Sequence, residues 1–508
     1  MKRIGRVIFL VAFILPALCQ ASQPAPASGE RLRRKEARRV REKIAQDYVG
    51  ARRSAETLYL KALTEMAKWL ITLNAQTDAK KVVTEIKSAD SQSAGLADLE
   101  KLMSGLTTSN ELNDQQRKDF EKRLNLARQQ RDDKLLALAR TCYEAGLLGY
   151  AYDLVWECLE INSDNAVARV AMGQVKVGNE WVSRYAATQL QQGNVYVSEV
   201  GWVPKTAAER IKAGEWGESG RAMSMADADK LHANRSTPWI IETENFTLKS
   251  TATRKQALAI AERLEAIRTL CFRQYLEFFL RGSKTKGAQL LFSAPDKKKL
   301  LVNYYGCKDD FIAVMQKFKT SPANKEVILN SAGIYSLFDH ASFFYYDPIF
   351  EQQQMVIMQH EVTHQVLSEY ARDGAVFPWL AEGAAESLEA AQLNHDGRLQ
   401  LPRSDAHPNV IGAAKMLAQG VLPPLSPLLT MRHEIFHQEP YRRNNYLLSG
   451  ALFRFLLDSN HGIYAADFLE MLYDSYRGKV GRLIDYIDLD DIALEKAFRG
   501  YLEAIGQK

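Results

Sequence analysis

The chain has 508 residues, of which 46% are hydrophobic and 25% are charged, and its formal net charge is +5. This length exceeds what one hydrophobic core usually serves, so we expect two or three domains. The composition is typical of a globular protein, and the charge is too weak to indicate a polyanion partner. We therefore expect no nucleic-acid binding.

The N-terminus has the pattern of a secretory signal. A basic start is followed by the apolar run 7–18 and by small residues that allow cleavage after Ala21. The run is short for a membrane span, which needs about 20 apolar residues. Leu18, before Cys19, is larger than a lipoprotein cleavage site prefers. We expect a cleaved signal peptide at 1–21, a secreted or periplasmic protein, and no membrane span after cleavage.

Residues 22–132 predict a helical region that follows a flexible linker. Long stretches lack Pro and Gly, and apolar residues recur at three- and four-residue steps, as at Leu63, Met66 and Leu70. The start of this region, at about 31–43, is dense in Arg and Lys. Because acidic residues are mixed in and no aromatic residues are interleaved, a solvated helix face is favoured over an anion-binding surface.

Residues 133–177 resemble one tetratricopeptide repeat. Small residues fall at helix-crossing positions such as Ala139 and Cys158, and a turn lies at Gly146. The resemblance implies a helical hairpin with a role in binding a protein partner. Cys142 and Cys158 would then face each other, either as one disulfide or as two buried small residues.

Residues 178–236 predict a small β-containing connector. Trp181-Val and Trp202-Val-Pro recur in similar settings, and residues 194–200 alternate as a short strand does. The two Trp side chains are favoured as packing anchors.

Residues 237–508 combine strand and helix signals. β-Branched and aromatic content predicts strands at about 239–249 and 288–293 and a strand pair within 333–346, and a long helix is predicted at about 253–279. With the helical N-terminal region, these elements predict an α+β protein.

The segment Met358-Gln-His-Glu-Val-Thr-His-Gln365 contains the pattern HExxH. His360 and His364 are four residues apart, so they lie on one helical face and can share a metal ion. Glu361 lies one step round the helix, near enough to take a proton from metal-bound water. Glu382 follows His364 by 18 positions at the start of another helix. Two imidazoles, a carboxylate and a water complete a catalytic zinc site.

The run Trp379-Leu-Ala-Glu-Gly-Ala-Ala385, following HExxH, resembles the gluzincins, specifically the aminopeptidase-N-like and peptidase MA-like families. In these enzymes the Glu is the third zinc ligand, commonly one residue further from the second His. The resemblance spans 237–508 and implies a zincin-like catalytic domain with a small sheet and an HExxH helix. It also implies an edge strand, here within 333–346, that pairs with an extended peptide substrate.

Two further roles follow from the same resemblance. In thermolysin-like relatives an acidic residue four positions after the ligand Glu accepts the free N–H of a zinc-bound His, and Glu386 has that offset. Gly383 would ease the close packing of the HExxH helix and the helix of Glu382.

A second HExxH pattern lies at His433–His437. Pro440 would end its helix within a turn, and no Glu lies near position 455, where a third ligand is expected. We interpret it as a coincidence or a segment that lines the cleft rather than a second zinc site.

The expected mechanism uses zinc to lower the pKa of its water to about 7, while Glu361 takes the proton and later delivers it to the leaving amine. Tyr446 is the candidate donor to the oxyanion, with Tyr441, His433 and His437 as alternatives and plain packing of Tyr446 equally open.

The motif Gly-Ala-Met-Glu-Asn, by which aminopeptidases hold a free amino terminus, is absent. We therefore expect a zinc metallopeptidase that cleaves extracytoplasmic proteins or peptides as an endopeptidase. The alternative is a catalytically inactive zincin-fold scaffold with a helical partner-binding module.

Overall fold

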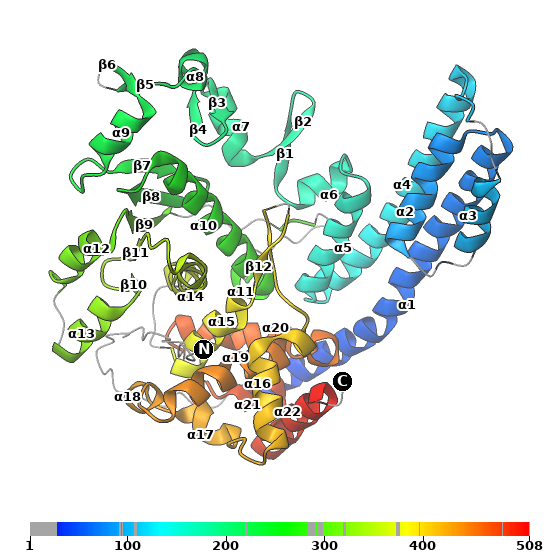
Figure 1. Cartoon of the computed structure of the whole chain (residues 1–508). Coiled ribbons are helices and arrows are strands. Elements are labelled where there is room, and N and C mark those ends of the chain that lie inside the picture. Colours follow the sequence, from blue (N-terminus) through cyan, green and yellow to red (C-terminus); the bar gives the residue numbers. More distant parts are fainter. Residues whose placement is uncertain are drawn as a thin grey trace. The chain divides into compact units, whose positions relative to one another are not determined.

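The computed structural model describes residues 28–90, 93, 95–105, 109–218, 221–281, 290–292, 298–318, 322–371, 376–395, 397–479 and 481–506 (Figure 1). The expected signal peptide lies outside the described residues. An N-terminal unit comprises the described residues of Glu36–Trp181 and Thr285–Ser293, and a C-terminal unit comprises those of Met1–Lys35, Val182–Lys284 and Ala294–Lys508. Helices predominate and the sheets are small, so the expected mixture of α and β structure is confirmed.

Helices occupy the N-terminal region in which apolar spacing predicted them. They are α1 (Ser28–Thr72), α2 (Gln76–Ala89), α3 (Leu96–Ser104), α4 (Asp114–Glu144), α5 (Leu148–Ile161) and α6 (Ala166–Ala171). Residues at helical spacing, such as Leu63 and Leu70 on α1, share one core with Ile86 and Leu99. These helices are amphipathic and bury their apolar faces against one another.

The basic start of α1 is not simply a solvated face, so that expectation is wrong at three positions. Arg34 donates from Nη2 to Glu470 Oε1 at 3.0 Å, and its guanidinium lies 4.4 Å from the centre of the Tyr486 ring. Arg38 and Arg41 are also buried. The three arginines recur at helical spacing, so they lie on one face of the helix.

Helices α4 and α5 form the expected helical hairpin. Asn113 caps α4, and Gly146 makes the turn with a φ of +79°. Cys142 and Cys158 are both free and buried, so the structure has two packed thiols there and no disulfide. The carboxylate of Asp132 accepts from the side-chain amides of two residues after α5, Asn162 and Asn165.

The region expected to be a small connector contains the same hairpin-and-helix unit three times. The elements are β1 (Gln174–Val177), β2 (Glu180–Ser183) and α7 (Arg184–Gln191), then β3 (Asn194–Val197), β4 (Gly201–Pro204) and α8 (Lys205–Lys212), then β5 (Glu215–Glu218), β6 (Arg221–Ser224) and α9 (Met225–His232). Gly173, Gly193 and Gly214 precede the copies with positive φ, where each ends a helix. Trp181 and Trp202 occupy equivalent second strands, which explains their recurrence.

The C-terminal unit contains a five-stranded mixed sheet in the order β10-β11-β9-β8-β7. Its strands are β7 (Trp239–Glu242), β8 (Phe246–Ser250), β9 (Leu300–Tyr305), β10 (Gly333–Ser336) and β11 (Ala341–Tyr345). Strand β9 pairs in parallel with β8 and β11, and the outer pairs are antiparallel. The predicted strand at 288–293 is wrong where it is described: residues 290–292 form no strand, and β9 takes that place in the order.

Helices cover both faces of this sheet. The helices between and after its strands are α10 (Arg254–Gln274), α11 (Leu276–Leu280), α12 (Lys308–Met315), α13 (Pro322–Asn330) and α14 (Glu351–Tyr370). Phe343 and Tyr345 of β11 share a core with Phe311 of α12. On the opposite face, Ser342 of β11 donates to the side chain of Gln365 on α14. Side chains of β11 thus point alternately to the two faces of the sheet, and α14 packs on one face beside the edge strand β10.

The remainder of the unit is helical apart from one short strand pair. It consists of α15 (Pro378–Glu389), β12 (Gln392–Leu393), β13 (Leu399–Gln400), α16 (Pro408–Ala418), α17 (Leu425–Thr430), α18 (His433–Phe436), α19 (Arg442–Asp458), α20 (Ala465–Tyr476), α21 (Leu483–Ile487) and α22 (Asp491–Gly506). Among all helices of the described residues, none is long and apolar enough to cross a membrane.

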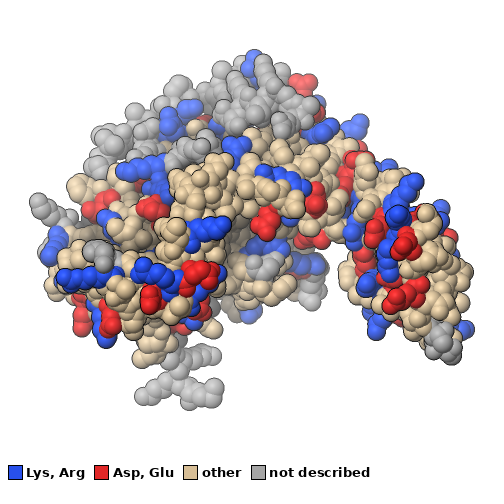
Figure 2. Space-filling model, turned by 90° about the horizontal axis from the view of Figure 1, so that it is seen from above, with Lys and Arg blue, Asp and Glu red and all other residues tan. Residues whose placement is uncertain are grey.

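Charges of both signs are interspersed on the face shown in Figure 2. Lys and Arg side chains and Asp and Glu side chains lie side by side over that face, in keeping with the small net charge of the chain.

Candidate metal centre

Helices α14 and α15 bring the three predicted metal ligands together. Every residue from Met358 to Ser368 on α14 is buried, so the HExxH segment lies inside the unit. Pro378 starts α15, where its missing N–H costs no hydrogen bond, and places Glu382 in the second turn. His360, His364 and Glu382 are 5%, 0% and 1% exposed, so three polar groups meet in a nearly dry site.

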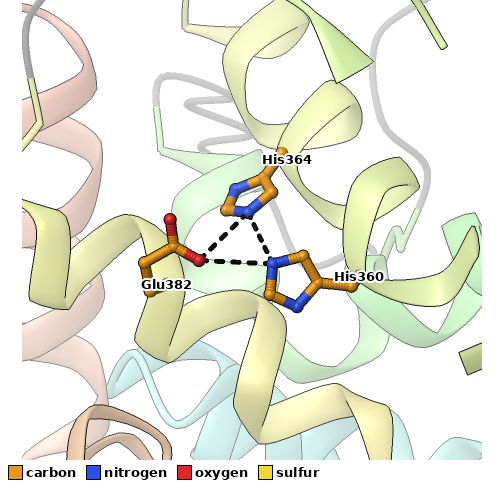
Figure 3. Close-up of side chains that lie close together, drawn as sticks. All are labelled: His360, His364 and Glu382. Carbon is orange, nitrogen blue, oxygen red and sulfur yellow. Dashed lines mark hydrogen bonds and ion pairs between the residues drawn. The ribbon is translucent and has the colours of Figure 1, made fainter. Parts of the chain in front are cut away.

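The ligand atoms point at one another (Figure 3). The two Nε2 atoms are 3.0 Å apart, and Glu382 Oε2 lies 3.2 Å from His360 Nε2 and 3.6 Å from His364 Nε2. Tetrahedral zinc with bonds of about 2.0–2.1 Å separates its ligand atoms by about 3.3 Å. The three distances bracket that value, so this donor set fits a zinc ion.

Electrostatics hold Glu382 in its charged form. Burial raises the pKa of this carboxyl, but hydrogen bonds from His360 and His364 lower it further, so the net shift is far downward. Burial lowers the pKa of His364. It also opposes charge on His360, yet Glu382 and Glu389 raise that pKa well above its usual value. The cluster therefore attracts positive charge, as a metal site requires.

Glu361 faces the sheet edge next to the three ligands. Its Oε2 accepts the backbone N–H of Tyr335 on β10 at 2.8 Å, and the residue is 3% exposed. Burial raises the pKa of Glu361 to about 8. The structure thus places β10, within the predicted 333–346 region, as an edge strand beside the predicted base.

Glu389, rather than Glu386, lies next to the Nδ1 atom of His360. The expectation that Glu386 accepts the free N–H of this imidazole is therefore wrong. Glu389 Oε1 lies 2.6 Å from His360 Nδ1. Glu386 instead accepts from Asn409 Nδ2 at 3.0 Å. Burial and the neighbouring Glu389 raise the pKa of Glu386 to about 8. The sequence did not single out Glu389; it lies nearly one helical turn beyond Glu386, and this shared helical face is the one signal that could have indicated it.

Gly383 allows close packing of α15 against α19, not against the HExxH helix α14 as expected. A Cβ at this position would lie 2.5 Å from Phe453 Cδ2 and 2.9 Å from the backbone oxygen of Ser449. Both atoms belong to α19, so the glycine lets α15 approach α19 rather than α14. This close approach fixes the helix that carries Glu382.

The second HExxH segment lies next to Tyr446. His437 Nδ1 is 3.0 Å from the Tyr446 hydroxyl, and His437 Nε2 is 3.2 Å from His433 Nε2. The Tyr446 ring stacks at 20° to the ring of His360, with 6.5 Å between centres. Among the described residues, no carboxylate or thiol completes a metal cluster with His433 and His437. Tyr441, the other candidate, is 61% exposed.

Both histidines of the second segment are held neutral. Burial lowers the pKa of His433, and it lowers the pKa of His437 to about 4. Burial raises the pKa of Tyr446 well above its usual value, so its hydroxyl keeps its proton. Tyr446 is therefore a neutral hydrogen-bond donor that His437 holds in place.

A pocket of about 950 Å³ opens beside the metal centre. His360, Glu361, Glu386 and Glu389 line it on the inner side, and residues of 352–357, 390–394 and 400–409 form the rest of its wall. The site thus combines a metal-ligand set, a buried carboxylate and space for part of a substrate.

Comparisons with protein-family models, with curated proteins and with solved structures found no match to this chain.

Proposed function

We propose that this chain is a zinc-dependent peptidase of the gluzincin type, with a zincin-like catalytic domain at residues 237–508. The proposal depends above all on the convergence of His360 Nε2, His364 Nε2 and Glu382 Oε2 at mutual distances of 3.0–3.6 Å. Such a set of two imidazoles and one carboxylate leaves a coordination position for catalysis.

These residues would hold zinc, which when bound supplies Lewis acidity and acidifies a coordinated water. Glu361 is the proton carrier. The N–H of Tyr335 occupies Oε2, so the other oxygen is left to accept the proton and to pass it to the leaving amine. Burial raises the pKa of Glu361, which strengthens this carboxylate as a proton acceptor.

The peptide would lie along β10. This strand is at the edge of the sheet, and its backbone meets the site at Tyr335. An extended peptide can add to such an edge through main-chain hydrogen bonds. The Tyr446 hydroxyl, which His437 positions, would donate a hydrogen bond to the oxyanion that develops on the scissile carbonyl.

We further propose export through the signal peptide at 1–21, which makes proteins and peptides of the periplasm or exterior the substrates. Because the Gly-Ala-Met-Glu-Asn motif is absent, we propose endopeptidase action. The N-terminal helical unit would bind a protein partner, as its tetratricopeptide-like hairpin suggests.

The test compares wild type with Glu361→Gln, His364→Ala and the surface variant Glu503→Gln. Bound zinc is measured by elemental analysis, and cleavage of unfolded casein is followed by mass spectrometry. We expect one zinc per chain in wild type, Glu361→Gln and Glu503→Gln, and none in His364→Ala. Cleavage should occur only in wild type and Glu503→Gln.

Two results would refute the proposal. Purified wild type without stoichiometric zinc would remove the metal centre, and equal cleavage by wild type and Glu361→Gln would remove the mechanism. If wild type holds zinc but cleaves no substrate, the inactive scaffold with a partner-binding module is the correct function.

A further inference from the structure

The pocket beside the metal centre contains a carboxylate oxygen without a partner. Glu386 is 4% exposed and lines this pocket. Its Oε2 accepts from Asn409, but no hydrogen bond reaches its Oε1 among the described residues. Buried polar atoms are nearly always paired in native proteins, so an orphaned oxygen on a residue that lines the pocket indicates a missing donor.

A second carboxylate lies next to this oxygen. One oxygen from Glu386, one from Glu389 and Nδ1 of His360 all lie within 4.8 Å of one another. The Glu389 side chain is 23% exposed, so an occupant of the pocket can reach it. Two adjacent carboxylates repel each other in a poorly solvated site, and a positive charge between them relieves that repulsion.

Among the described residues, no Lys or Arg side chain pairs with either of these two carboxylates. Among the described residues that line the pocket, Arg403 is the only Lys or Arg. Its side chain is 82% exposed and pairs with Asp405. His407 also lines the pocket, but its Nε2 faces the Ser387 carbonyl and its Nδ1 accepts the backbone N–H of Asn409.

A protonated amine fits this site better than a second metal ion. The 2.6 Å separation between His360 Nδ1 and Glu389 Oε1 is that of a charge-assisted hydrogen bond, with a proton between them. A metal on Nδ1 would have to displace this proton from a ring whose Nε2 already faces the zinc ligands. An ammonium group instead donates to both carboxylates and leaves the bond intact.

The rest of the pocket suits the carbon chain of a peptide. Val356 and Ile357 of α14 and Leu401 and Pro402 after β13 give it apolar walls. Long cationic side chains lay their methylene stems along such surface while the charged end finds a partner.

We infer that Glu386 and Glu389 form an acidic subsite that binds a positively charged amine of the peptide substrate. The source of the amine is a Lys side chain or a free amino terminus. The inference depends on the proposed peptidase function, because it assigns that enzyme its substrate preference.

The experiment uses zinc-loaded Glu361→Gln protein, so that binding is measured without turnover. The probes are three fluorescent decapeptides: one with an acetylated N-terminus and a single Lys, one with norleucine in its place, and one with a free N-terminus and no Lys. Binding is measured by fluorescence anisotropy in the Glu361→Gln background, alone and combined with Glu386→Gln, Val356→Lys or Glu503→Gln. Wild-type cleavage of the same peptides is measured in parallel.

We expect the Lys or the free-amine peptide to bind at least about ten-fold more tightly than the norleucine peptide, since hydrogen bonds to charged groups are each worth about that factor. Whichever of the two binds tightly identifies the source. Glu386→Gln and Val356→Lys should each abolish most of the preference, the second by placing a rival ammonium in the pocket. Glu503→Gln should keep it.

Equal binding of all three peptides would overturn the subsite, even if wild type cleaves them. A preference that survives both pocket variants would overturn it as well. So would a second equivalent of bound zinc that disappears in Glu386→Gln, because the pair would then be a metal site. Selective binding without any wild-type cleavage would support the subsite and count against the peptidase.

Discussion

Replacing Gly383 with Ala tests whether the contact between α15 and α19 fixes the metal centre. A Cβ there would meet Phe453 Cδ2 at 2.5 Å and the Ser449 backbone oxygen at 2.9 Å. The Phe453 ring can turn, but the carbonyl belongs to the helix, so α15 and α19 must separate by about half an ångström. Glu382, next to Gly383, would move away from both imidazoles.

The energy follows from two opposing effects. Overpacking a core costs about 1–3 kcal/mol, and a contact with backbone belongs at the upper end of that range. Alanine in place of glycine returns up to about 1 kcal/mol through helix propensity. The net expectation for Gly383→Ala is a destabilisation of about 2 kcal/mol.

Gly500→Ala is the matched control. Gly500 also lies inside a helix, α22, and a Cβ there meets no atom within 4 Å. Because alanine has a higher helix propensity than glycine and causes no clash here, this variant should be stabilised by up to about 1 kcal/mol.

Hydrogen exchange followed by mass spectrometry resolves the effect by segment. Peptides from α15 and α19 should exchange about 30-fold faster in Gly383→Ala than in wild type. The affinity of the variant for zinc should be lower than that of wild type. Exchange in α1–α3 should not change. If Gly383→Ala behaves like Gly500→Ala in both exchange and zinc content, close packing does not position Glu382, and the reasoning is wrong.

Three further substitutions test single contacts. Glu389→Gln weakens the acceptor on His360 Nδ1, so zinc affinity in competition with a chelator should fall about 10–100-fold; an unchanged affinity would refute that role. Tyr446→Phe should keep zinc and lower kcat about 100-fold if its hydroxyl stabilises the oxyanion, and an unchanged kcat would assign the residue to packing. Burial lowers the pKa of His407 from 6.5 to about 4. Protons therefore bind the unfolded chain first, and stability should fall by up to about 3 kcal/mol between pH 6.5 and pH 4. In His407→Gln, the free energy of unfolding from denaturant titrations should lose this part of its decrease between pH 6.5 and pH 4. An equal dependence of that free energy on pH in both proteins would contradict the prediction.

Local rules were enough for the N-terminal helices and for the grouping of His360, His364 and Glu382. HExxH places two imidazoles on one helical face whatever surrounds it, and Glu382 was identified by its position at a helix start. Strand β9 was missed because it is buried between parallel neighbours and lacks the alternation of a half-exposed strand.

Sequence spacing could not show which glutamate contacts His360, because tertiary packing determines this contact. Glu386 and Glu389 are both on α15, and an offset of four residues favoured Glu386. Helix α16, however, presents Asn409 to Glu386, while Glu389 reaches His360. The choice between these glutamates thus depends on a contact between Glu386 and a residue 23 positions further along the chain. The same holds for Gly383, whose neighbours on α19 are distant in sequence.

The two HExxH segments differ in the group that faces their imidazole pairs. Their imidazole pairs are almost equally close, with 3.0 Å between the Nε2 atoms on α14 and 3.2 Å between those of His433 and His437. The difference lies in the third group. Glu382 faces the first pair with a charged oxygen, whereas the second pair meets the uncharged hydroxyl of Tyr446. The carboxylate of α15, rather than the histidine spacing, therefore makes the first pair the candidate metal site. The second segment then contributes by holding Tyr446 beside that site.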